Sequence, residues 1–453
     1  MRKIGERIKD YNEIYTKYDF NTIVPILNTC SNCSEPFCSN KVVIDKKTVG
    51  CPIDIDIKKI ISLMKYNLFD EAYLELTKNN PFPEITCRAC KGYCETACIN
   101  NKDKVVTSIK DIIRTLADYG LDKFAKYEVL EKKNKTVAII GSGASGLACA
   151  SFLVTNGYDV TVYEKNELPG GTLMYGISNM RLDKEILNKR IELLKNAGVK
   201  FICNSEVTRV ISPFDVQKNY DAIILASGVV KRNFVCSGMG LKNVMYATDY
   251  LKKVTKNIIS NKASDITTNK SILILGSGDT TDEVISYALR ENAKMVAVID
   301  HKDMPKLKRT TSWPFEDDSI NNVSEAIQEA RFKSFTDPRG FNMTIKEIVG
   351  TKEVEGAKIV QVKWENNRPV ILEHEQVFPI DMVIVSIGNT GFEEDLINYF
   401  DIDLVNKMVD ERNHKNKDNV FICGDALLNN GITPLAIKDG INCAKEVIKY
   451  FEA

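Results

Sequence analysis

The stretch KTVAIIGSGASG, residues 135–146, decides the fold of this 453-residue chain. A short apolar strand leads into a Gly-x-Gly-x-x-Gly turn and then into a predicted helix. Gly141 allows the tight turn, Gly143 lets the backbone approach a pyrophosphate, and Gly146 permits close packing of the helix on the strand. The next predicted strand ends at Glu164, in position to bind ribose hydroxyls. Glycine-rich turns also occur without a ligand, but the complete unit favours a Rossmann-like nucleotide-binding domain.

The same strand–glycine–helix–strand unit occurs a second time. A strand over 271–275 is followed by GSGDTT at 276–281, a helix, and a strand that ends at Asp300. This motif is looser, because Thr281 stands where the third glycine would be. It is either a second nucleotide site or a structural repeat that binds nothing. The duplication predicts two nucleotide domains with parallel sheets.

A third segment with a recognisable pattern lies near the C-terminus. Residues 419–425 form a predicted strand that ends on a Gly-Asp pair, and a helix is predicted from 435 to 451. Thr433 as N-cap and Pro434 at the first helical position mark its start. Beside a flavin, this helix dipole would stabilise negative charge on the reduced ring, and Asp425 would accept hydrogen bonds from the ribityl chain. The alternative is a purely structural strand, turn and helix.

Eight of the thirteen cysteines lie within the first hundred residues, between stretches of helical apolar spacing such as 57–64 and 69–76. They are Cys30, Cys33, Cys38, Cys51, Cys87, Cys90, Cys94 and Cys98. Eight thiolates are what two [4Fe–4S] clusters require, and Cys-x2-Cys with a Gly-Cys-Pro partner is a ferredoxin-type pattern. Two structural zinc sites are the alternative. The spacing and the dense last four cysteines favour iron.

The composition narrows the function by exclusion. The formal net charge is zero, so the sequence predicts no nucleic-acid partner. The first twenty residues are charged throughout and the apolar runs are short, so we expect a cytoplasmic protein without a signal peptide or membrane partner. Only three histidines are present, which weakens a hydrolase interpretation. The other cysteines are expected to be buried small hydrophobes: Cys149, Cys203, Cys236, Cys423 and Cys443.

Taken in order along the chain, these motifs resemble one known family. The two cysteine groups, NPFPE at 80–84, Gly-x-Gly-x-x-Gly, LPGG at 168–171, Gly-x-Gly-Asp-Thr and Cys-Gly-Asp follow one another from about residue 25 to the C-terminus. This order resembles the small subunit of bacterial glutamate synthase. It is similar also to the N-terminal half of dihydropyrimidine dehydrogenase and to the larger subunit of ferredoxin-dependent transhydrogenases.

The resemblance implies an α/β protein with an all-helical iron–sulfur domain before two Rossmann-like domains. The FAD domain would be interrupted by the NAD(P)H domain. The expected segments are 1–130 for two [4Fe–4S] clusters, 135–265 and 381–453 for FAD, and 270–380 for NADH or NADPH. Within the last of these, residues 303–339 are expected to be a loop-rich insertion, with no chemistry assigned to it.

The resemblance also implies binding residues. Those expected to bind FAD are Gly141, Gly143, Ala144, Ser145, Gly146, Glu164, Lys165, Gly171, Thr172, Val207, Gly424, Asp425, Thr433, Pro434 and Leu435. Those expected to face the nicotinamide nucleotide are Gly276, Ser277, Gly278, Asp279, Thr280, Thr281, Asp300, His301, Lys302, Ser386, Ile387 and Gly388. No catalytic acid or base is expected, because the cofactor carries the hydride chemistry.

In the family that the chain resembles, the cluster ligands interleave. The resemblance implies one cluster on Cys30, Cys33, Cys38 and Cys98, and three corners of the other on Cys51, Cys90 and Cys94. Relatives often complete the second cluster with Glu or Gln on the following helix, where this chain has an isoleucine within 109–114. Cys87 stands where relatives usually have glycine. Our hypothesis is that Cys87 is the replacement fourth ligand.

The second nucleotide strand gives a hint of cofactor preference. NADPH-specific relatives place an Arg pair after this strand, and this chain has Asp300, His301 and Lys302 instead. An acid at that point favours the free 2′-hydroxyl of NADH, while His301 and Lys302 keep some positive charge. The sequence therefore favours NADH.

The predicted function is that of an electron-input subunit. NAD(P)H would deliver hydride to FAD, and single electrons would pass through the clusters to a separate catalytic subunit of the glutamate synthase or dihydropyrimidine dehydrogenase kind. One alternative is a ferredoxin:NAD(P)+ transhydrogenase-type subunit running in either direction. A self-contained disulfide reductase would need a Cys-x2-Cys pair after Cys98, and none occurs there. An alternative of another class is a non-catalytic, zinc-bound scaffold.

Overall fold

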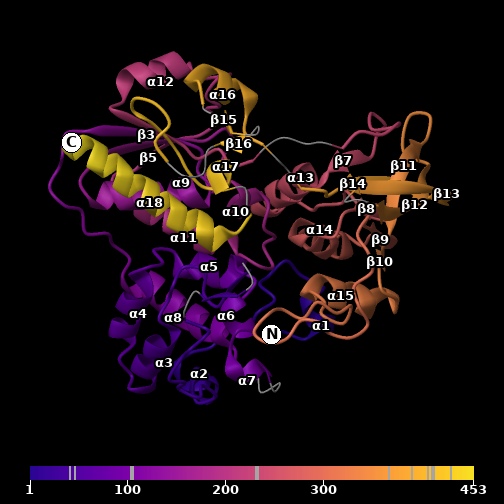
Figure 1. Cartoon of the computed structure of the whole chain (residues 1–453), viewed down its shortest axis with the longest axis horizontal. Helices are drawn as coiled ribbons and strands as arrows, with labels where there is room; N and C mark the ends of the chain where they lie inside the picture. The colour runs from indigo at the N-terminus through magenta and orange to yellow at the C-terminus, as the bar shows by residue number, and fades with distance from the viewer. Residues whose placement is uncertain are drawn as a thin grey trace.

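A computed structural model describes most of the chain. The described residues are 1–39, 42–44, 47–102, 107–229, 234–365, 368–388, 391–402, 404–405, 408–409, 414–428 and 431–453. A helical N-terminal region lies against two α/β regions, each built on a five-stranded parallel sheet (Figure 1). The predicted fold class is thereby confirmed. Within the described ranges, no helix combines the length and apolar character that crossing a bilayer requires.

The N-terminal region consists mainly of helices, and apolar side chains of most of them pack with the cysteines in one core. These helices are α1 (Ile4–Arg7), α2 (Phe20–Leu27), α3 (Ile57–Lys65), α4 (Phe69–Thr77), α5 (Pro83–Ala89), α6 (Tyr93–Thr96), α7 (Ile99–Lys102) and α8 (Ile109–Lys123). The carboxylates of Asp19 and Asp56 cap α2 and α3. The region is not all-helical, because two short strands with β-branched residues, β1 (Val42–Ile44) and β2 (Lys47–Val49), pair as an antiparallel ribbon.

The first parallel sheet joins distant parts of the chain. Its strands, in spatial order, are β17 (Val420–Ile422), β6 (Ala222–Leu225), β3 (Thr136–Ile140), β4 (Asp159–Tyr163) and β5 (Lys200–Ile202). The surrounding helices are α9 (Ala144–Thr155), α10 (Thr172–Tyr175), α11 (Lys184–Asn196), α12 (Pro213–Asn219), α16 (Glu394–Phe400), α17 (Asp425–Leu428) and α18 (Thr433–Glu452). Val420 pairs with Ile223, so the last strand completes the sheet of the first glycine motif. The terminal helix α18 packs against α9 (Figure 1).

The second parallel sheet lies on the other side of the molecule (Figure 1). Its strands, in spatial order, are β10 (Arg339–Gly340), β9 (Met295–Ile299), β8 (Ser271–Leu275), β14 (Met382–Val385) and β7 (Val244–Tyr246). Its helices are α13 (Ala247–Ile259), α14 (Asp279–Arg290) and α15 (Glu325–Ser334). β7 and β14 lie outside the range of 270–380 predicted for this domain. Both are strands of three or four residues, too short for their sheet to be assigned from an apolar pattern.

Two smaller features complete the fold. Three antiparallel strands, β11 (Met343–Val349), β12 (Gly356–Glu365) and β13 (Arg368–Pro379), form a separate sheet, and β15 (Leu404–Val405) pairs with β16 (Met408–Val409). The segment 303–339 is irregular as predicted as far as residue 323, but α15 follows. The Ser324 hydroxyl caps this helix by accepting a hydrogen bond from the Ile327 N–H.

Buried ion pairs fasten the N-terminal region to the two α/β regions. Arg190 of α11 donates to both carboxylate oxygens of Glu84 on α5, at 2.8 and 3.0 Å. Arg290 of α14 and Arg7 of α1 both donate to Glu329 of α15. Buried charges are retained only where they are paired and hydrogen-bonded. The three regions are therefore held in a fixed mutual arrangement.

Candidate functional site

A cavity of about 460 Å³ opens where the strands of the first sheet end. Loops at the carboxyl ends of parallel strands form the ligand sites of open α/β sheets. Eleven of the fifteen residues predicted to bind FAD line this cavity: Gly141, Gly143, Ala144, Ser145, Glu164, Lys165, Gly171, Thr172, Val207, Asp425 and Thr433. The other four, which lie outside its wall, are Gly146, Gly424, Pro434 and Leu435.

The glycines of the first motif have different structural roles. Gly141 has a φ of +105°, and a Cβ there would lie 2.5 Å from the Ala226 carbonyl oxygen. A Cβ on Gly146 would lie 2.1 Å from the Gly141 oxygen, so Gly146 sets the contact between α9 and the turn. Gly143 is the N-cap of α9 and has open space around it, so an anion can approach the helix N-terminus there.

Glu164 stands at the end of β4 with its carboxylate buried. It accepts hydrogen bonds from the Ser142 hydroxyl and backbone, and from Asn166 at 2.8 and 2.6 Å. The Ser142 hydroxyl in turn accepts a hydrogen bond from the Gly170 N–H at 2.9 Å. Ser142 was not predicted, although its place between two motif glycines marks it. Its hydroxyl couples the glycine turn, the strand-end acid and the LPGG segment.

The C-terminal segment completes the wall of the cavity. Asp425 accepts a hydrogen bond from the Gly431 N–H at 3.0 Å, and Thr433 faces the cavity. The predicted N-cap is wrong by one residue, because Ile432 is the N-cap of α18 and Thr433 is already helical. Proline is tolerated anywhere in the first turn, where its missing N–H has no partner to lose, so Pro434 does not fix the start. The helix N-terminus still points toward the cavity.

Two of the wall residues that the sequence did not predict are Tyr175 and Lys252. Tyr175 of α10 belongs to no sequence motif, yet it lines the cavity and accepts a hydrogen bond from the Leu168 N–H at 3.1 Å. Lys252 of α13 reaches the wall and donates to Asn166. Burial lowers the pKa of Lys252, with help from the nearby Lys256 and Lys165 ammonium groups. Only the tertiary fold brings α13 to this edge of the first sheet.

The second glycine motif repeats the geometry of the first. Gly276 has a φ of +109°, and a Cβ there would lie 2.4 Å from the Ser386 oxygen, whereas Gly278 has open space. The Thr281 hydroxyl donates to the Gly276 oxygen at 2.8 Å and lies 2.9 Å from the Ser386 hydroxyl, from which it can accept a hydrogen bond. Thr281 therefore replaces the third glycine by bonding the turn to the end of β14. The next predicted residues, Ile387 and Gly388, follow directly.

A buried acid ends the second strand of this unit as well. Asp300 accepts hydrogen bonds from the Ser277 hydroxyl and from the Lys302 N–H at 3.0 Å. His301 Nδ1 lies 3.4 Å from the same carboxylate, and the Lys302 ammonium is exposed. Ser277 and Asp300 thus correspond to Ser142 and Glu164 in the first unit. The predicted pair of strand-end acids is present in the structure, each held by a glycine-loop serine.

The remaining residues of this motif face the N-terminal region. Asp279, at the first position of α14 and next to Thr280, forms an ion pair of 3.0 Å with Lys91. Lys91 directly follows Cys90. The N-terminus of α14 therefore touches the cysteine-bearing loop.

The eight N-terminal cysteines divide between two neighbouring cavities. The first cavity is lined by Cys30, Cys33, Cys38 and Cys98. The second is lined by Cys51, Cys87, Cys90 and Cys94. Ile57 and Ile109 belong to both walls, so the two cavities adjoin. Two sets of four thiols fit the donor requirement of two [4Fe–4S] clusters.

The second cysteine cavity adjoins the nucleotide cavity. Pro434 lines it, while the preceding Thr433 lines the nucleotide cavity. Ile109, Lys110 and Ile113 of α8 are also in its wall, and none of these three residues has a carboxylate or amide side chain. Cys87 lies 3.4 Å from the Glu84 oxygen and 3.6 Å from the Arg88 guanidinium. Burial raises the pKa of the Cys87 thiol to about 12.

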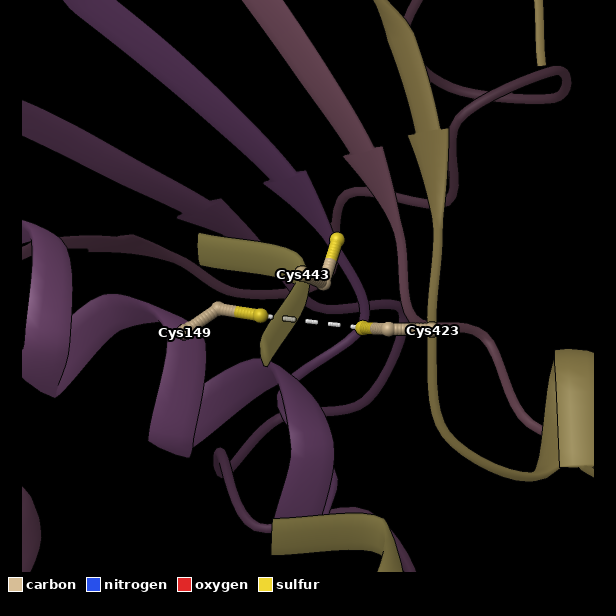
Figure 2. Close-up of side chains that lie close together, drawn as sticks. All are labelled: Cys149, Cys423 and Cys443. Carbon is tan, nitrogen blue, oxygen red and sulfur yellow. Dashed lines mark hydrogen bonds between the residues drawn. The ribbon is translucent and has the colours of Figure 1, made fainter. Parts of the chain in front are cut away.

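Three of the remaining cysteines meet in the interior of the first α/β region (Figure 2). Cys149 of α9 lies 3.6 Å from Cys423, and its thiol donates to the Gly440 oxygen of α18 at 3.0 Å. Cys443 is the third, and burial raises the pKa of the Cys149 and Cys443 thiols. The prediction of buried small hydrophobes is confirmed for these three. It is wrong for Cys203 and Cys236, which are half-buried because they lie in edge or connecting segments.

Two sequence families match the chain. The pyridine nucleotide-disulphide oxidoreductase family matches residues 135–442, and the family described as dihydropyrimidine dehydrogenase domain II, 4Fe-4S cluster, matches residues 7–126. The chain is 33% identical to the glutamate synthase [NADPH] small chain of Bacillus subtilis, over 98% of this chain and 94% of that one. It is 30% identical to glutamate synthase [NADH] of Saccharomyces cerevisiae, over 93% of this chain and 20% of the yeast protein.

Solved structures share the fold of the nucleotide-binding part. FprA of Mycobacterium tuberculosis, in complex with NADPH, superposes with a TM-score of 0.56 at 15% identity, over 70% of this chain and 84% of FprA. At this identity the likeness concerns the fold alone. The two matching families meet at the boundary between the helical region and the first sheet. The chain is therefore an oxidoreductase of the pyridine nucleotide-disulphide oxidoreductase family with a 4Fe-4S domain, and it belongs with the small chains of glutamate synthase.

Proposed function

We propose that this chain takes hydride from NAD(P)H onto FAD and passes single electrons through two [4Fe–4S] clusters to a separate catalytic subunit. The observation that carries the proposal is the sequence of three adjoining cavities. Thr433 and Pro434 separate the nucleotide cavity from the second cysteine cavity, and Ile57 and Ile109 separate the two cysteine cavities. Because only one or two side chains lie between neighbouring cavities, cofactors bound in them would be close enough to each other for electron transfer.

The first cavity is the proposed FAD site. The N-terminus of α9 at Gly143 would hold the pyrophosphate, because its free N–H groups and dipole favour an anion. Glu164 would bind the ribose, and its carboxylate is already oriented by Ser142 and Asn166. Asp425 and the start of α18 would face the flavin end of the cofactor. When bound, FAD supplies the step from a two-electron donor to one-electron acceptors.

The second glycine motif is the proposed nicotinamide nucleotide site. Gly278 leaves the N-terminus of α14 open to the pyrophosphate, and Asp300 would bind the adenosine ribose. Because Asp300 is buried and hydrogen-bonded, it would accept bonds from a free 2′-hydroxyl and would repel a 2′-phosphate. We therefore propose a preference for NADH. Reduction of the flavin about tenfold faster by NADPH than by NADH would overturn this preference.

The two cysteine cavities are the proposed cluster sites. Cys30, Cys33, Cys38 and Cys98 would ligate one cluster, and Cys51, Cys87, Cys90 and Cys94 the other. The first of these cavities lies closer to the surface, since Ser31 and Glu35 in or beside its wall are exposed. Electrons would therefore leave from the first cluster.

The electron acceptor is proposed to be a separate glutamate synthase-type large subunit. The chain corresponds to only 20% of the yeast glutamate synthase that it matches, so most of that protein has no counterpart here. A transhydrogenase-type role in either direction is the second candidate, because cofactors in three adjoining cavities would carry electrons equally well both ways. Which protein co-purifies with the chain from its host would separate the two.

An anaerobic preparation tests the main proposal. We expect flavin absorbance with a broad cluster band, about eight iron atoms and eight sulfides per chain, and bleaching of both bands on addition of NADH. A colourless protein that holds zinc would overturn the proposal and support the scaffold instead. Flavin without iron would limit the function to hydride transfer.

A further inference from the structure

The proposed function uses no residue of the insertion before α15. Within it, residues 306–320 fold into a closed loop. The Ile320 N–H donates to the Lys306 oxygen at 2.9 Å, and the Thr310 N–H donates to Asp318 at 2.8 Å. The Arg309 side chain donates to the Thr311 oxygen at 2.6 Å. These bonds hold the tip of the loop, where Trp313 lies, in a defined position.

Trp313 reaches from the second α/β region into the wall of the first cysteine cavity. Its indole N–H donates to the Cys98 carbonyl oxygen at 3.2 Å. Its ring meets the Phe37 ring edge-on, with centroids 5.2 Å apart, and the Lys102 ammonium lies 5.8 Å from its centroid. Trp313 therefore contacts the segments on both sides of the cavity, one carrying Cys38 and the other carrying Cys98.

This cavity differs from the second one in its exposure. Each cavity has half-buried cysteines, but the first also has the exposed Ser31 and Glu35 in its wall, whereas the residues that line the second are buried or half-buried. Water near an iron–sulfur cluster stabilises its more negative, reduced form, and exposure is one of the factors that set its potential. An apolar cover over the first cavity would therefore change the potential of a cluster bound there.

We propose that Trp313 is a positioning residue that shields the first cluster from water and fixes the Cys98 segment through its indole hydrogen bond. This inference rests on the proposed function, since it requires a cluster on Cys30, Cys33, Cys38 and Cys98. Its consequence is that the nucleotide-binding region itself controls the potential and the stability of the cluster from which electrons leave.

The test compares W313A and W313F with the wild type in the full-length anaerobic protein. A redox titration followed by electron paramagnetic resonance gives the cluster potentials, and loss of cluster absorbance in air gives the decay rates. We expect one cluster of W313A to have a more positive potential than in the wild type. That cluster, which holds about half of the iron, should decay in air about tenfold faster than in the wild type. W313F keeps an apolar ring without the hydrogen bond, so its clusters should decay nearly as slowly as those of the wild type.

The control is Phe335→Ala, which removes an aromatic ring of the same region that is 92% exposed and should leave both readouts unchanged. If W313A fails to fold, Phe37→Leu removes the ring against which Trp313 packs and should give the same direction of change. Wild-type potentials and decay rates in W313A, with full iron content, would overturn the proposal. A wild type without iron would instead contradict the proposed function, so the two failures are distinguishable.

Discussion

Cys87 and Ile113 both line the second cysteine cavity, one from α5 and the other from α8. The resemblance implied a Glu or Gln on α8 and a glycine at the position of Cys87. In this chain the possible ligand is the thiol on α5, and the residue on α8 is aliphatic. The fourth ligand would then come from the same helix end as Cys90, which makes the ligand set all-thiolate.

Cys87→Ser is expected to remove the second cluster and to lower the iron content to about half. Adding Ile113→Glu to this variant should return the iron, because a carboxylate would again reach the cavity from α8. Iron analysis and the low-temperature resonance spectrum of the reduced protein measure both effects. Cys203→Ser, which removes a cysteine outside both cavities, is the control. Full iron and an unchanged spectrum in Cys87→Ser would contradict the assignment.

His414 supports the edge of the nucleotide cavity through Asp439. The Asp439 carboxylate accepts hydrogen bonds from the Gly424 N–H at 2.6 Å and lies 2.9 Å from His414 Nε2. Burial alone would lower the pKa of His414, but the carboxylates of Asp439 and Glu446 outweigh it and raise the pKa to about 9. The charged imidazolium therefore stabilises the folded state.

Because the pKa of His414 lies above the ordinary value of 6.5, the pH range in which its charge stabilises the folded state is defined. The stabilisation is fully present below about pH 6.5 and is lost as the pH rises through about 9, because between these values the unfolded state binds fewer protons than the folded state. We expect the free energy of unfolding to fall by about 3 kcal/mol across this range. His414→Gln should be less stable at pH 6 and should show a flatter pH dependence in urea unfolding. An unchanged slope in this variant would contradict the assignment.

At the scale of the elements, each glycine loop combines one crowded glycine with one open glycine. In the second loop a side chain on Gly276 would collide with the Ser386 backbone, whereas a side chain on Gly278 would meet only open space. Gly278→Ala should therefore fold normally and weaken NAD(P)H binding about tenfold, or about 1.4 kcal/mol, because its methyl group blocks the pyrophosphate.

Gly276→Ala should instead lower the stability, since both its φ and its space exclude a Cβ. Gly240→Ala, in an open and exposed turn, is the matched control for both variants. Titration of flavin reduction with NADH measures the binding, and thermal unfolding measures the stability. Equal NADH binding by Gly278→Ala and the wild type would show that the nucleotide binds elsewhere.

The elements themselves were predictable where the pattern was local. Apolar runs followed by glycine motifs located β3, β8 and the helices after them, and apolar spacing near 3.6 located α3 and α4. The short strand β7 lacked a comparable pattern, and only its pairing with β14 shows which sheet it joins. The start of α18 was misplaced by one residue, because proline fits several positions of a first helical turn.

At the scale of the whole molecule, the proposed function gives the three adjoining cavities an order in electron transfer. Cys33→Ser should remove the proposed first cluster, whose cavity shares no lining residue with the nucleotide cavity. We expect the rate of flavin reduction by NADH to stay within about twofold, because hydride transfer involves only the two nucleotide sites. Transfer to the partner subunit should be lost. Rapid-mixing absorbance with and without the partner measures both, and slowed flavin reduction would contradict this order.

Motifs and resemblance predicted much of the candidate site, and tertiary contacts supplied the rest. The division of eight cysteines into two sets followed from the family pattern, and the cavities group them in the same way. Ser142 and Lys252 were missed for opposite reasons, since one lies inside the motif and the other reaches the cavity from a distant helix. Trp313 could not be predicted, because it contacts Cys98 from 215 positions away.

The pairing of β17 with β6 bears on how the protein is made. Val420 lies 197 positions after its partner Ile223, so the first sheet stays incomplete until nearly the whole chain has left the ribosome. The second sheet and the cysteine-bearing helices contain all their own strands and ligands earlier in the chain. Flavin loading is therefore expected to be the last step of biogenesis, and a chain that stops before Val420 would be released with metal sites but without a complete flavin site.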